Sequence, residues 1–252
     1  MCTVSWVHED RGYQLFCNRD EKLTRGVATD PQLLCRDGVR FLAPIDWDFG
    51  GTWIAANEFG VSVCLLNGPG KSHTAADSHH CSRGQIVLDL VSAKSLQEVQ
   101  ARLWQYDLSV YEPFTLAVLE RGQSEVVMEW DGEEKRILPV GDSYLPLVSS
   151  SFDPVAVRNE RRGQLAQMIH RSGALDPAVL LMFHQSHLPG RGPNSPCMHR
   201  ADAETVSFSW VTVTDSEVSF YYSAGSPCKT FTGESFTLGV KQEESAECLV
   251  CC

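Results

Sequence analysis

The sequence predicts an α+β domain built in layers, because strand-like segments fill its first third, helical segments its middle, and strands return at the end. The runs "TVSWV" (3–7) and "YQLF" (13–16) flank the polar turn "HEDRG", which predicts a β-hairpin. A loop rich in charge, Gly and Pro is expected from there to about residue 49. "TWIAAN" and "VSVCLL" then flank "EFG" and predict a second hairpin, in which Gly60 is free to take a positive φ.

The middle of the chain has helical signals. Apolar residues recur with helical spacing from Gly84, and segment 95–105 begins with Ser95 as N-cap and Glu98 three positions later. The remaining expected elements are strands at 115–120 and 125–130, helices at 154–171 and 177–187, and strands at 205–213 and 216–222. There is no internal repeat, so we expect one domain over residues 1–240 and a cysteine-containing tail over 241–252.

Charge and hydropathy exclude two classes of partner. The formal net charge is -11, and the longest basic cluster (Arg158, Arg161, Arg162) is interpreted as a solvated helix face, so no nucleic-acid partner is expected. No apolar run approaches the ~20 residues that span a bilayer, so no membrane span is expected. Charged residues 8–11 interrupt the first apolar stretch before a signal peptide could form. We therefore expect a cytoplasmic protein, and its oligomeric state is left open.

The ten cysteines do not resemble a disulfide framework. Cys17 and Cys64 lie in apolar runs, where a free cysteine behaves as a small hydrophobe. Cys248 and Cys251 have CxxC spacing without a second pair, so the ending "ECLVCC" is interpreted as a reduced tail, with metal or redox chemistry as the alternative.

A histidine-rich loop at 68–83 is the other place where a metal could bind. Its members are His73, Asp77, His79 and His80, but no spacing fixes them on one face. A solvated loop or substrate rim is the preferred interpretation, and we expect neither a metal ion nor a cofactor.

Cys2 is the first candidate for catalysis. Removal of the initiator methionine would leave a thiol and a free α-amine on one residue, with reference pKa values of about 8.5 and 7.7–8.0. One residue would then supply both the nucleophile and its base, as in N-terminal nucleophile hydrolases. The alternative is a cysteine of no functional importance.

The cluster "NRDE" ends the strand that is expected to pair with the one starting at Cys2. A hairpin turn at residues 9–11 would bring residue 2 opposite residues 17–20. The Asp20 carboxylate could then orient the α-amine, and Arg19 could stabilise the thiolate or bind a substrate carboxylate. A surface turn with mutually satisfied charges is the alternative.

Several motifs resemble the NRDE family, which includes the transport and Golgi organisation 2 proteins. They are "MCT" at the terminus, "CNRDE" (17–21), "GGTW" (50–53), "NEFGVSVCLLN" (57–67) and "SRGQIVLDL" (82–90). "CMHRADAETVS" (197–207) resembles the family's late segment more loosely.

That family in turn resembles the choloylglycine hydrolase and penicillin V acylase group of N-terminal nucleophile hydrolases, through "NEFGVSVCLLNGPG". The resemblance implies a four-layer αββα sandwich with Cys2 as nucleophile and Arg19 and Asp20 beside it. It also implies that the Asn67 amide donates to the oxyanion, a contact worth roughly 2.7–4 kcal/mol.

Four further residues are expected to contact substrate. Ser150 stands in "VSSSF" where the hydrolases have a second active-site Asn, and Arg200 loosely matches a late Arg. Asn18 belongs to the "NRDE" cluster, and Trp53 follows "DFGG", where aromatic residues could line an acyl pocket or simply pack in the core.

Two functions of different class are compatible with these residues. The first is a hydrolase that cleaves a linear amide, or a thioester, of a small acylated molecule through Cys2. The alternative is a non-catalytic carrier of an apolar ligand, such as a lipid, an acyl chain or haem, on the same fold. Intact Cys2, Asp20 and Asn67 favour the hydrolase, whereas Ser150 favours the carrier.

Overall fold

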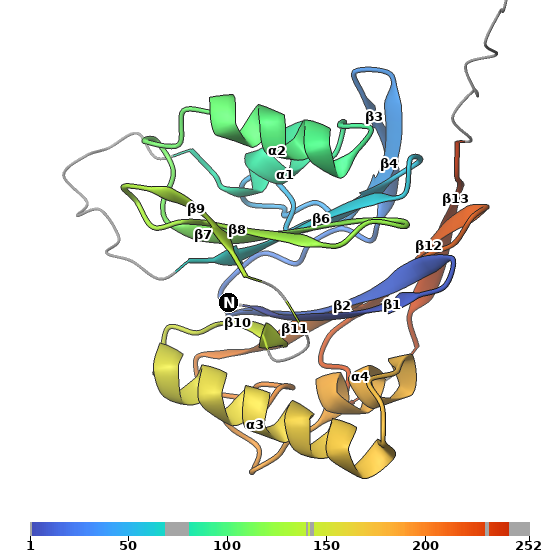
Figure 1. Ribbon diagram of the computed structural model, residues 1–252. Helices are drawn as coiled ribbons and strands as arrows, with labels where there is room; N and C mark the ends of the chain where they lie inside the picture. The colour runs from blue at the N-terminus through green and yellow to red at the C-terminus, as the bar shows by residue number, and fades with distance from the viewer. Residues whose placement is uncertain (1, 69–80, 140, 142–143, 230–231, 242–252) are drawn as a thin grey trace, which may run out of the picture.

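Two antiparallel sheets lie face to face between two layers of helices in the computed structural model, which describes residues 2–68, 81–139, 141, 144–229 and 232–241 (Figure 1). The six-stranded sheet has the order β10-β1-β2-β11-β12-β13, and the seven-stranded sheet has the order β3-β4-β5-β6-β7-β8-β9. Helices α1 and α2 cover the seven-stranded sheet, and α3 and α4 cover the six-stranded one. The expected αββα sandwich is confirmed.

Along the described part of the chain, six strands come first, followed by a helical pair, four strands, a second helical pair and a final three-stranded meander. The strands of the seven-stranded sheet are β3 (Gln32–Arg36), β4 (Val39–Ala43), β5 (Ile54–Asn57), β6 (Val61–Asn67), β7 (Phe114–Glu120), β8 (Val126–Trp130) and β9 (Lys135–Leu138). Those of the six-stranded sheet are β1 (Cys2–Glu9), β2 (Gly12–Lys22), β10 (Leu147–Ser149), β11 (Ala203–Val213), β12 (Glu217–Ala224) and β13 (Glu234–Gly239). The helices are α1 (Gly84–Leu90), α2 (Leu96–Gln105), α3 (Pro154–Ser172) and α4 (Pro177–Gln185).

Helix boundaries follow the capping signals in the sequence. The Ser95 side chain accepts from the Glu98 backbone N–H at 3.2 Å, as expected for α2. Asp153 and Asp176 cap α3 and α4 in the same way, each followed by a proline at the start of its helix. Gly173 ends α3 with a φ of 87°, a conformation that favours glycine.

The register of β1 against β2 decides which side chains face which layer. Cys2 pairs with Arg19 and Thr3 pairs with Asn18, as the hairpin argument predicted. Because side chains alternate along a strand, Cys2 and Arg19 face the opposing sheet, whereas Asn18 and Asp20 face the helices α3 and α4. Strand β1 is paired on both sides, with β2 and β10.

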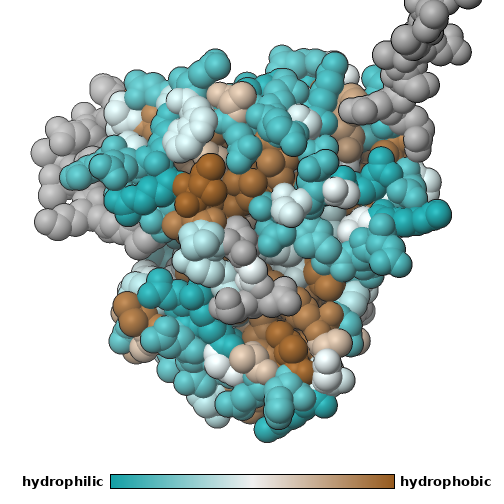
Figure 2. All heavy atoms as spheres, viewed as in Figure 1, coloured by the Kyte–Doolittle hydropathy of each residue, from teal (hydrophilic) through white to brown (hydrophobic). Residues whose placement is uncertain are grey.

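Two apolar cores hold the layers together. One lies between the sheets and extends under α3 and α4, and the other fills the space between the seven-stranded sheet and α1 and α2. The Tyr13 hydroxyl links the sheets, since it donates to the Gly60 carbonyl at 3.1 Å and to Ser62 Oγ at 2.7 Å. Hydrophilic residues cover most of the face in Figure 2, with apolar areas on both halves.

The segment before residue 49 is not all loop, so that prediction was wrong. Strands β3 and β4 form a hairpin there through Asp37 and Gly38, whose φ values of 51° and 76° define a tight turn of the Asp-Gly kind. The hairpin was missed because β3 is an exposed edge strand and lacks a buried face. Strands β9, β10 and β13, which are short or largely exposed, were missed as well.

Across the part of the chain that the structure describes, none of the helices combines the length and the apolar character needed to cross a bilayer.

The environment of His184 on α4 leads to a prediction of how the free energy of unfolding depends on pH. Its side chain is fully buried and forms a hydrogen bond of 2.8 Å between Nε2 and Ser5 Oγ, and burial followed by the nearby Arg161 lowers its pKa to about 3. Unfolded histidine titrates near 6.5, so below that pH the unfolded state binds a proton that the folded state does not. The free energy of unfolding should therefore fall, as pH drops from 6.5 toward 3, by about 1.4 kcal/mol per pH unit from this residue alone.

Urea unfolding at pH 7, 6 and 5 measures this effect. In the variant His184→Gln, the free energy of unfolding should fall less steeply with decreasing pH, by the contribution of about one proton. The variant His170→Gln, at an exposed position late in α3, should keep the wild-type pH dependence. Equal pH dependence in wild type and His184→Gln would show that His184 does not stay neutral in the fold.

Candidate functional site

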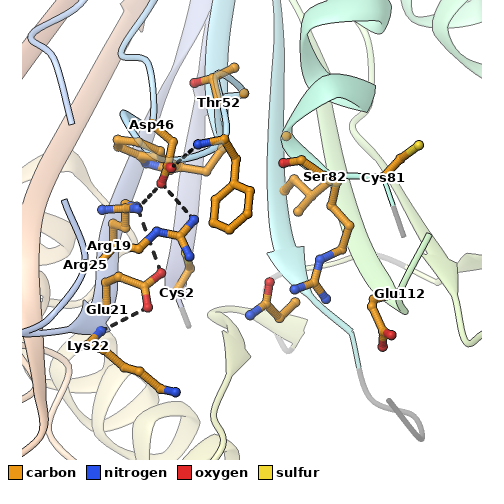
Figure 3. A pocket seen from close by; sticks show the side chains of 17 residues that line it. Cys2, Arg19, Glu21, Lys22, Arg25, Asp46, Thr52, Cys81, Ser82 and Glu112 are labelled. Atoms are coloured by element: carbon orange, nitrogen blue, oxygen red, sulfur yellow. Dashed lines mark hydrogen bonds and ion pairs between the residues drawn. The ribbon is translucent and has the colours of Figure 1, made fainter. Parts of the chain in front are cut away.

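A cavity of about 400 Å³ opens where the N-terminal end of β1 meets the loop between β4 and β5. Cys2, Arg19, Trp53 and Asn67, four of the residues expected from the sequence, line it. Figure 3 shows Arg19, Arg25 and Asp46 on one wall, and Cys81, Ser82 and Glu112 on the opposite one. Segments far apart in the sequence therefore build this cavity together.

Cys2 is held in place from both sides. Its backbone nitrogen donates to Ser149 Oγ of β10 at 2.9 Å, and its side chain is 5% exposed. A hydrogen bond with Cys17, together with burial, raises the pKa of the Cys2 thiol well above its usual value. The thiol is thus protonated at neutral pH, and any nucleophilic role requires a base that removes the proton during the reaction.

Arg19 lies opposite Cys2 and is fixed by acidic partners. Its guanidinium donates to Asp46 Oδ2 at 2.5 Å, lies 3.8 Å from Glu21 Oε2, and stacks 4.5 Å from the centre of the Trp53 ring. Arg25 reaches the same Asp46 oxygen at 3.1 Å. Asp46 was not singled out from the sequence, because nothing in "PIDWDFGG" indicates that its carboxylate faces the "NRDE" strand.

The "DFGG" segment needs glycine for a close approach of backbones. A Cβ at Gly51 would lie 2.8 Å from the backbone of Gly84 at the start of α1, and one at Gly84 would lie 2.8 Å from the Thr52 nitrogen. The Thr52 nitrogen donates to the Gly84 carbonyl at 3.2 Å. This contact joins the two walls of the cavity, because Arg83 precedes Gly84 and Trp53 follows Thr52.

Asp20 faces the helices rather than the cavity. Its carboxylate is 1% exposed, accepts from Thr205 Oγ1 at 2.6 Å, and lies 3.5 Å from Arg161 Nη1. Burial raises its pKa, although Arg161 and Thr205 favour the charged form. Asp20 follows Arg19, the partner of Cys2. Its contact with the α-amine of a processed chain stays a prediction.

Arg161 corrects one expectation from the sequence. It was interpreted as part of a solvated helix face, but its side chain is 1% exposed and reaches from α3 to Thr3 and Asp20 on the strands below. It also donates to the carbonyls of Asn194 at 3.3 Å and Pro193 at 3.2 Å. The interpretation failed because neighbouring charges in sequence do not reveal that one of them pairs with a buried carboxylate on another element.

The remaining predicted residues lie apart from this cavity. Asn18 is buried under α4, where its side-chain amide donates to the carbonyls of His184 and Pro196, each at 2.9 Å. Arg200 forms two hydrogen bonds to Asp202, at 2.9 and 2.7 Å. Ser150 lines an adjoining hollow of about 690 Å³, which also contains Asn67. Asn18 and Arg200 are therefore not brought together with Cys2.

Sequence reasoning also missed Ser149 and Arg83. Ser149 is next to the predicted Ser150, and only the β1–β10 register shows that it lies opposite Cys2. Arg83 belongs to "SRGQIVLDL" and lines the cavity beside Ser82. The histidine-rich loop with His73, Asp77, His79 and His80, and the cysteine tail from residue 242, lie outside the described residues.

The profile of the transport and Golgi organisation 2 family matches residues 1–188. The chain belongs to this family. The family segment therefore contains β1, the "NRDE" strand and all of the described residues that line the cavity. A search of curated protein sequences finds no match.

Solved structures extend the likeness to the whole fold. The family member described here is similar to a C2A mutant of the conjugated bile acid hydrolase from Clostridium perfringens, with a TM-score of 0.58 and 12% identity over 97% of this chain and 98% of that one. A second variant of that hydrolase gives the same values. The N-acylethanolamine-hydrolyzing acid amidase ortholog from Caenorhabditis elegans has a TM-score of 0.56 and 13% identity, over 83% and 92% of the two chains. These neighbours are N-terminal nucleophile hydrolases, and the likeness shows a shared fold.

Proposed function

We propose that the protein is an N-terminal cysteine hydrolase that cleaves a linear amide, or a thioester, of a small acylated molecule. The observation that carries the proposal is the position of Cys2 at the start of a strand paired on both sides, with its side chain lining a cavity next to Arg19 and Asn67. The hydrolase fold of the structural neighbours supports the reaction class.

The proposed reaction begins after removal of Met1. The α-amine of Cys2 takes the thiol proton as Sγ attacks the carbonyl carbon, and the amine passes that proton to the leaving nitrogen. The thioester that forms on Cys2 is then cleaved by water, which releases a carboxylic acid and restores the thiol. The protonated resting thiol fits this scheme, because the base acts only during the attack.

Neighbouring groups have defined tasks in this scheme. Ser149 Oγ accepts from the Cys2 nitrogen and fixes its orientation. Asn67 supplies a side-chain amide to the oxyanion, because it lines the same cavity as Cys2 at the end of β6. Trp53 Nε1 is buried without a hydrogen-bond acceptor among the described residues, and its side chain lines the same cavity.

The charges of the cavity indicate the kind of substrate. Among the described residues that line it, Arg19, Lys22, Arg25 and Arg83 are basic and Glu21, Asp46 and Glu112 are acidic. Arg19 and Arg25 are engaged with Asp46, whereas Arg83 donates to the Pro113 carbonyl at 2.9 Å. Arg83 is therefore the group proposed to bind a carboxylate of the substrate.

Arg83→Met should raise KM about tenfold for acyl amides that carry a carboxylate, because a hydrogen bond to a charged group is lost. For neutral acyl amides the KM should change little. The kcat of the variant should be similar to that of the wild type on both classes of substrate. Steady-state kinetics on matched charged and neutral substrates checks this. An equal loss on both classes would assign Arg83 a structural role.

Intact mass spectrometry tests the proposed function directly. The purified chain should lack Met1, and an activated acyl ester should add one acyl group, located on Cys2 by peptide mapping. Acylation that spares Cys2 and modifies exposed Cys35 or Cys81 would contradict the proposal.

The carrier function remains the second candidate because apolar side chains are exposed near the cavity. Phe49 lines it and is 56% exposed, and Trp47 on the same loop is 75% exposed. A carrier would bind an apolar acyl ligand at this rim with unchanged affinity in a Cys2→Ala variant. Binding without turnover in the wild type would support the carrier.

A further inference from the structure

A second cluster of reactive side chains lies away from the cavity, where two loops meet. His187 follows α4, Cys197 and His199 precede β11, and Cys228 follows β12. One donor atom from each residue lies within 4.8 Å of the corresponding atoms of the other three. Cys197 is fully buried and the other three are partly buried.

The distances fit the coordination sphere of a single ion. His199 Nε2 lies 3.5 Å from Cys197 Sγ and 3.4 Å from Cys228 Sγ. In a tetrahedral zinc site with Zn–S of about 2.3 Å and Zn–N of about 2.05 Å, sulfur and nitrogen ligands are about 3.6 Å apart. Since both sulfurs lie at about this distance from one nitrogen, the spacing of the side chains suits a single ion rather than a larger cluster.

Several groups that surround the four side chains are also typical of a metal site. His199 Nδ1 lies 3.3 Å from Glu204 Oε2, and a metal-binding histidine commonly donates its second ring N–H to a carboxylate. The Glu204 carboxylate is itself 3.1 Å from Lys229 Nζ. His187 Nε2 is buried without a hydrogen-bond partner among the described residues, and its ring centre lies 5.1 Å from that of His199.

We propose that His187, Cys197, His199 and Cys228 bind one zinc ion in a structural site. Two thiolates and two neutral imidazoles match the donor preference of zinc, and binding releases the two thiol protons. The two thiolates balance the charge of the ion. All four positions are filled by protein, which is the arrangement of structural rather than catalytic zinc.

The site would fix the segment that supports Asp20. Met198, between two of the ligands, donates its backbone N–H to Thr205 Oγ1 at 2.8 Å, and that hydroxyl donates to Asp20 Oδ1 at 2.6 Å. The sequence analysis did not single out these four residues, because they are spread over residues 187–228 and share only a Cys-x-His spacing. The histidine-rich loop and the tail CxxC, which were considered instead, supply none of them.

Metal analysis of the full chain tests the proposal. Protein purified under reducing conditions without chelator should contain about one equivalent of zinc, and cobalt(II) should give the absorption of a tetrahedral ion with thiolate charge transfer. Cys228→Ser should bind zinc at least about tenfold more weakly in competition with a chelator, and Glu204→Gln about 10–100-fold more weakly. Cys35→Ser, at an exposed site in β3, is the matched control and should bind as wild type.

Two further measurements show whether these four residues, rather than other cysteines of the chain, bind the zinc. The triple variant Cys248→Ser, Cys251→Ser, Cys252→Ser should retain its zinc, since the four proposed ligands lie elsewhere in the chain. Loss of zinc in that variant with retention in Cys228→Ser would overturn the proposal. A Cys197–Cys228 disulfide in the purified protein, together with failure of the reduced protein to bind zinc or cobalt, would overturn it as well.

Discussion

Cys2→Ala should lower the rate of acyl transfer by about three orders of magnitude or more, because the substitution removes the proposed nucleophile. The side chain is small and belongs to the first residue of β1, so the thermal unfolding midpoint should change little. Any substrate found by screening amides and thioesters serves for the assay, with circular dichroism as the check on folding.

Insertion of one alanine between Met1 and Cys2 separates two parts of the proposed mechanism. The thiol is kept, but the free α-amine moves one residue away from it and can no longer act as its base. Hydrolysis should fall nearly as far as in Cys2→Ala. Cys35→Ser is the control, because Cys35 is an exposed thiol on the edge strand β3. Hydrolysis that survives Cys2→Ala would remove Cys2 from the mechanism.

Arg161→Met should destabilise the fold by about 3–5 kcal/mol, because it removes the guanidinium that pairs with the buried Asp20 carboxylate. The same change removes the hydrogen bonds to Thr3 and to the 193–194 loop, which tie α3 to β1. Urea unfolding at pH 7 measures the loss. Arg171→Met, at an exposed position in the last turn of α3, should cost less than about 0.5 kcal/mol.

Asp20→Asn in the Arg161→Met background tests whether the cost arises from the buried charge. The double variant should recover part of the stability lost in Arg161→Met, because no uncompensated carboxylate remains. A cost that is simply the sum of the two single changes would show that Asp20 and Arg161 do not interact energetically.

Local signals in the sequence predicted the helices and the inner strands well. The capping residue of α2 and the polar turn between β1 and β2 act over a few residues, so they can be recognised without knowledge of the fold. The edge strands β3 and β13 were missed because their exposed faces lack the alternation that marks a half-buried strand.

The candidate site was predictable only in part. The motif resemblance pointed to Cys2, Arg19 and Asn67, which line one cavity. Asp46 and Ser149 were not predicted, because their proximity to Arg19 and Cys2 depends on a loop path and a strand register that arise only in the folded chain. The four residues of the proposed zinc site lie on two loops, and no local pattern unites them.

The alternation along β2 gives the "CNRDE" stretch two separate roles, one for each face of its sheet. Odd-numbered positions 17 and 19 serve the cavity and the space between the sheets, and even-numbered positions 18 and 20 serve the helix layer. Insertion or deletion of a single residue between Gly12 and Cys17 would exchange these roles at once. An alignment of distant relatives should therefore keep the number of residues between Cys2 and this stretch odd or even as it is here. That parity identifies equivalent positions more strictly than the identity of any one residue in the strand.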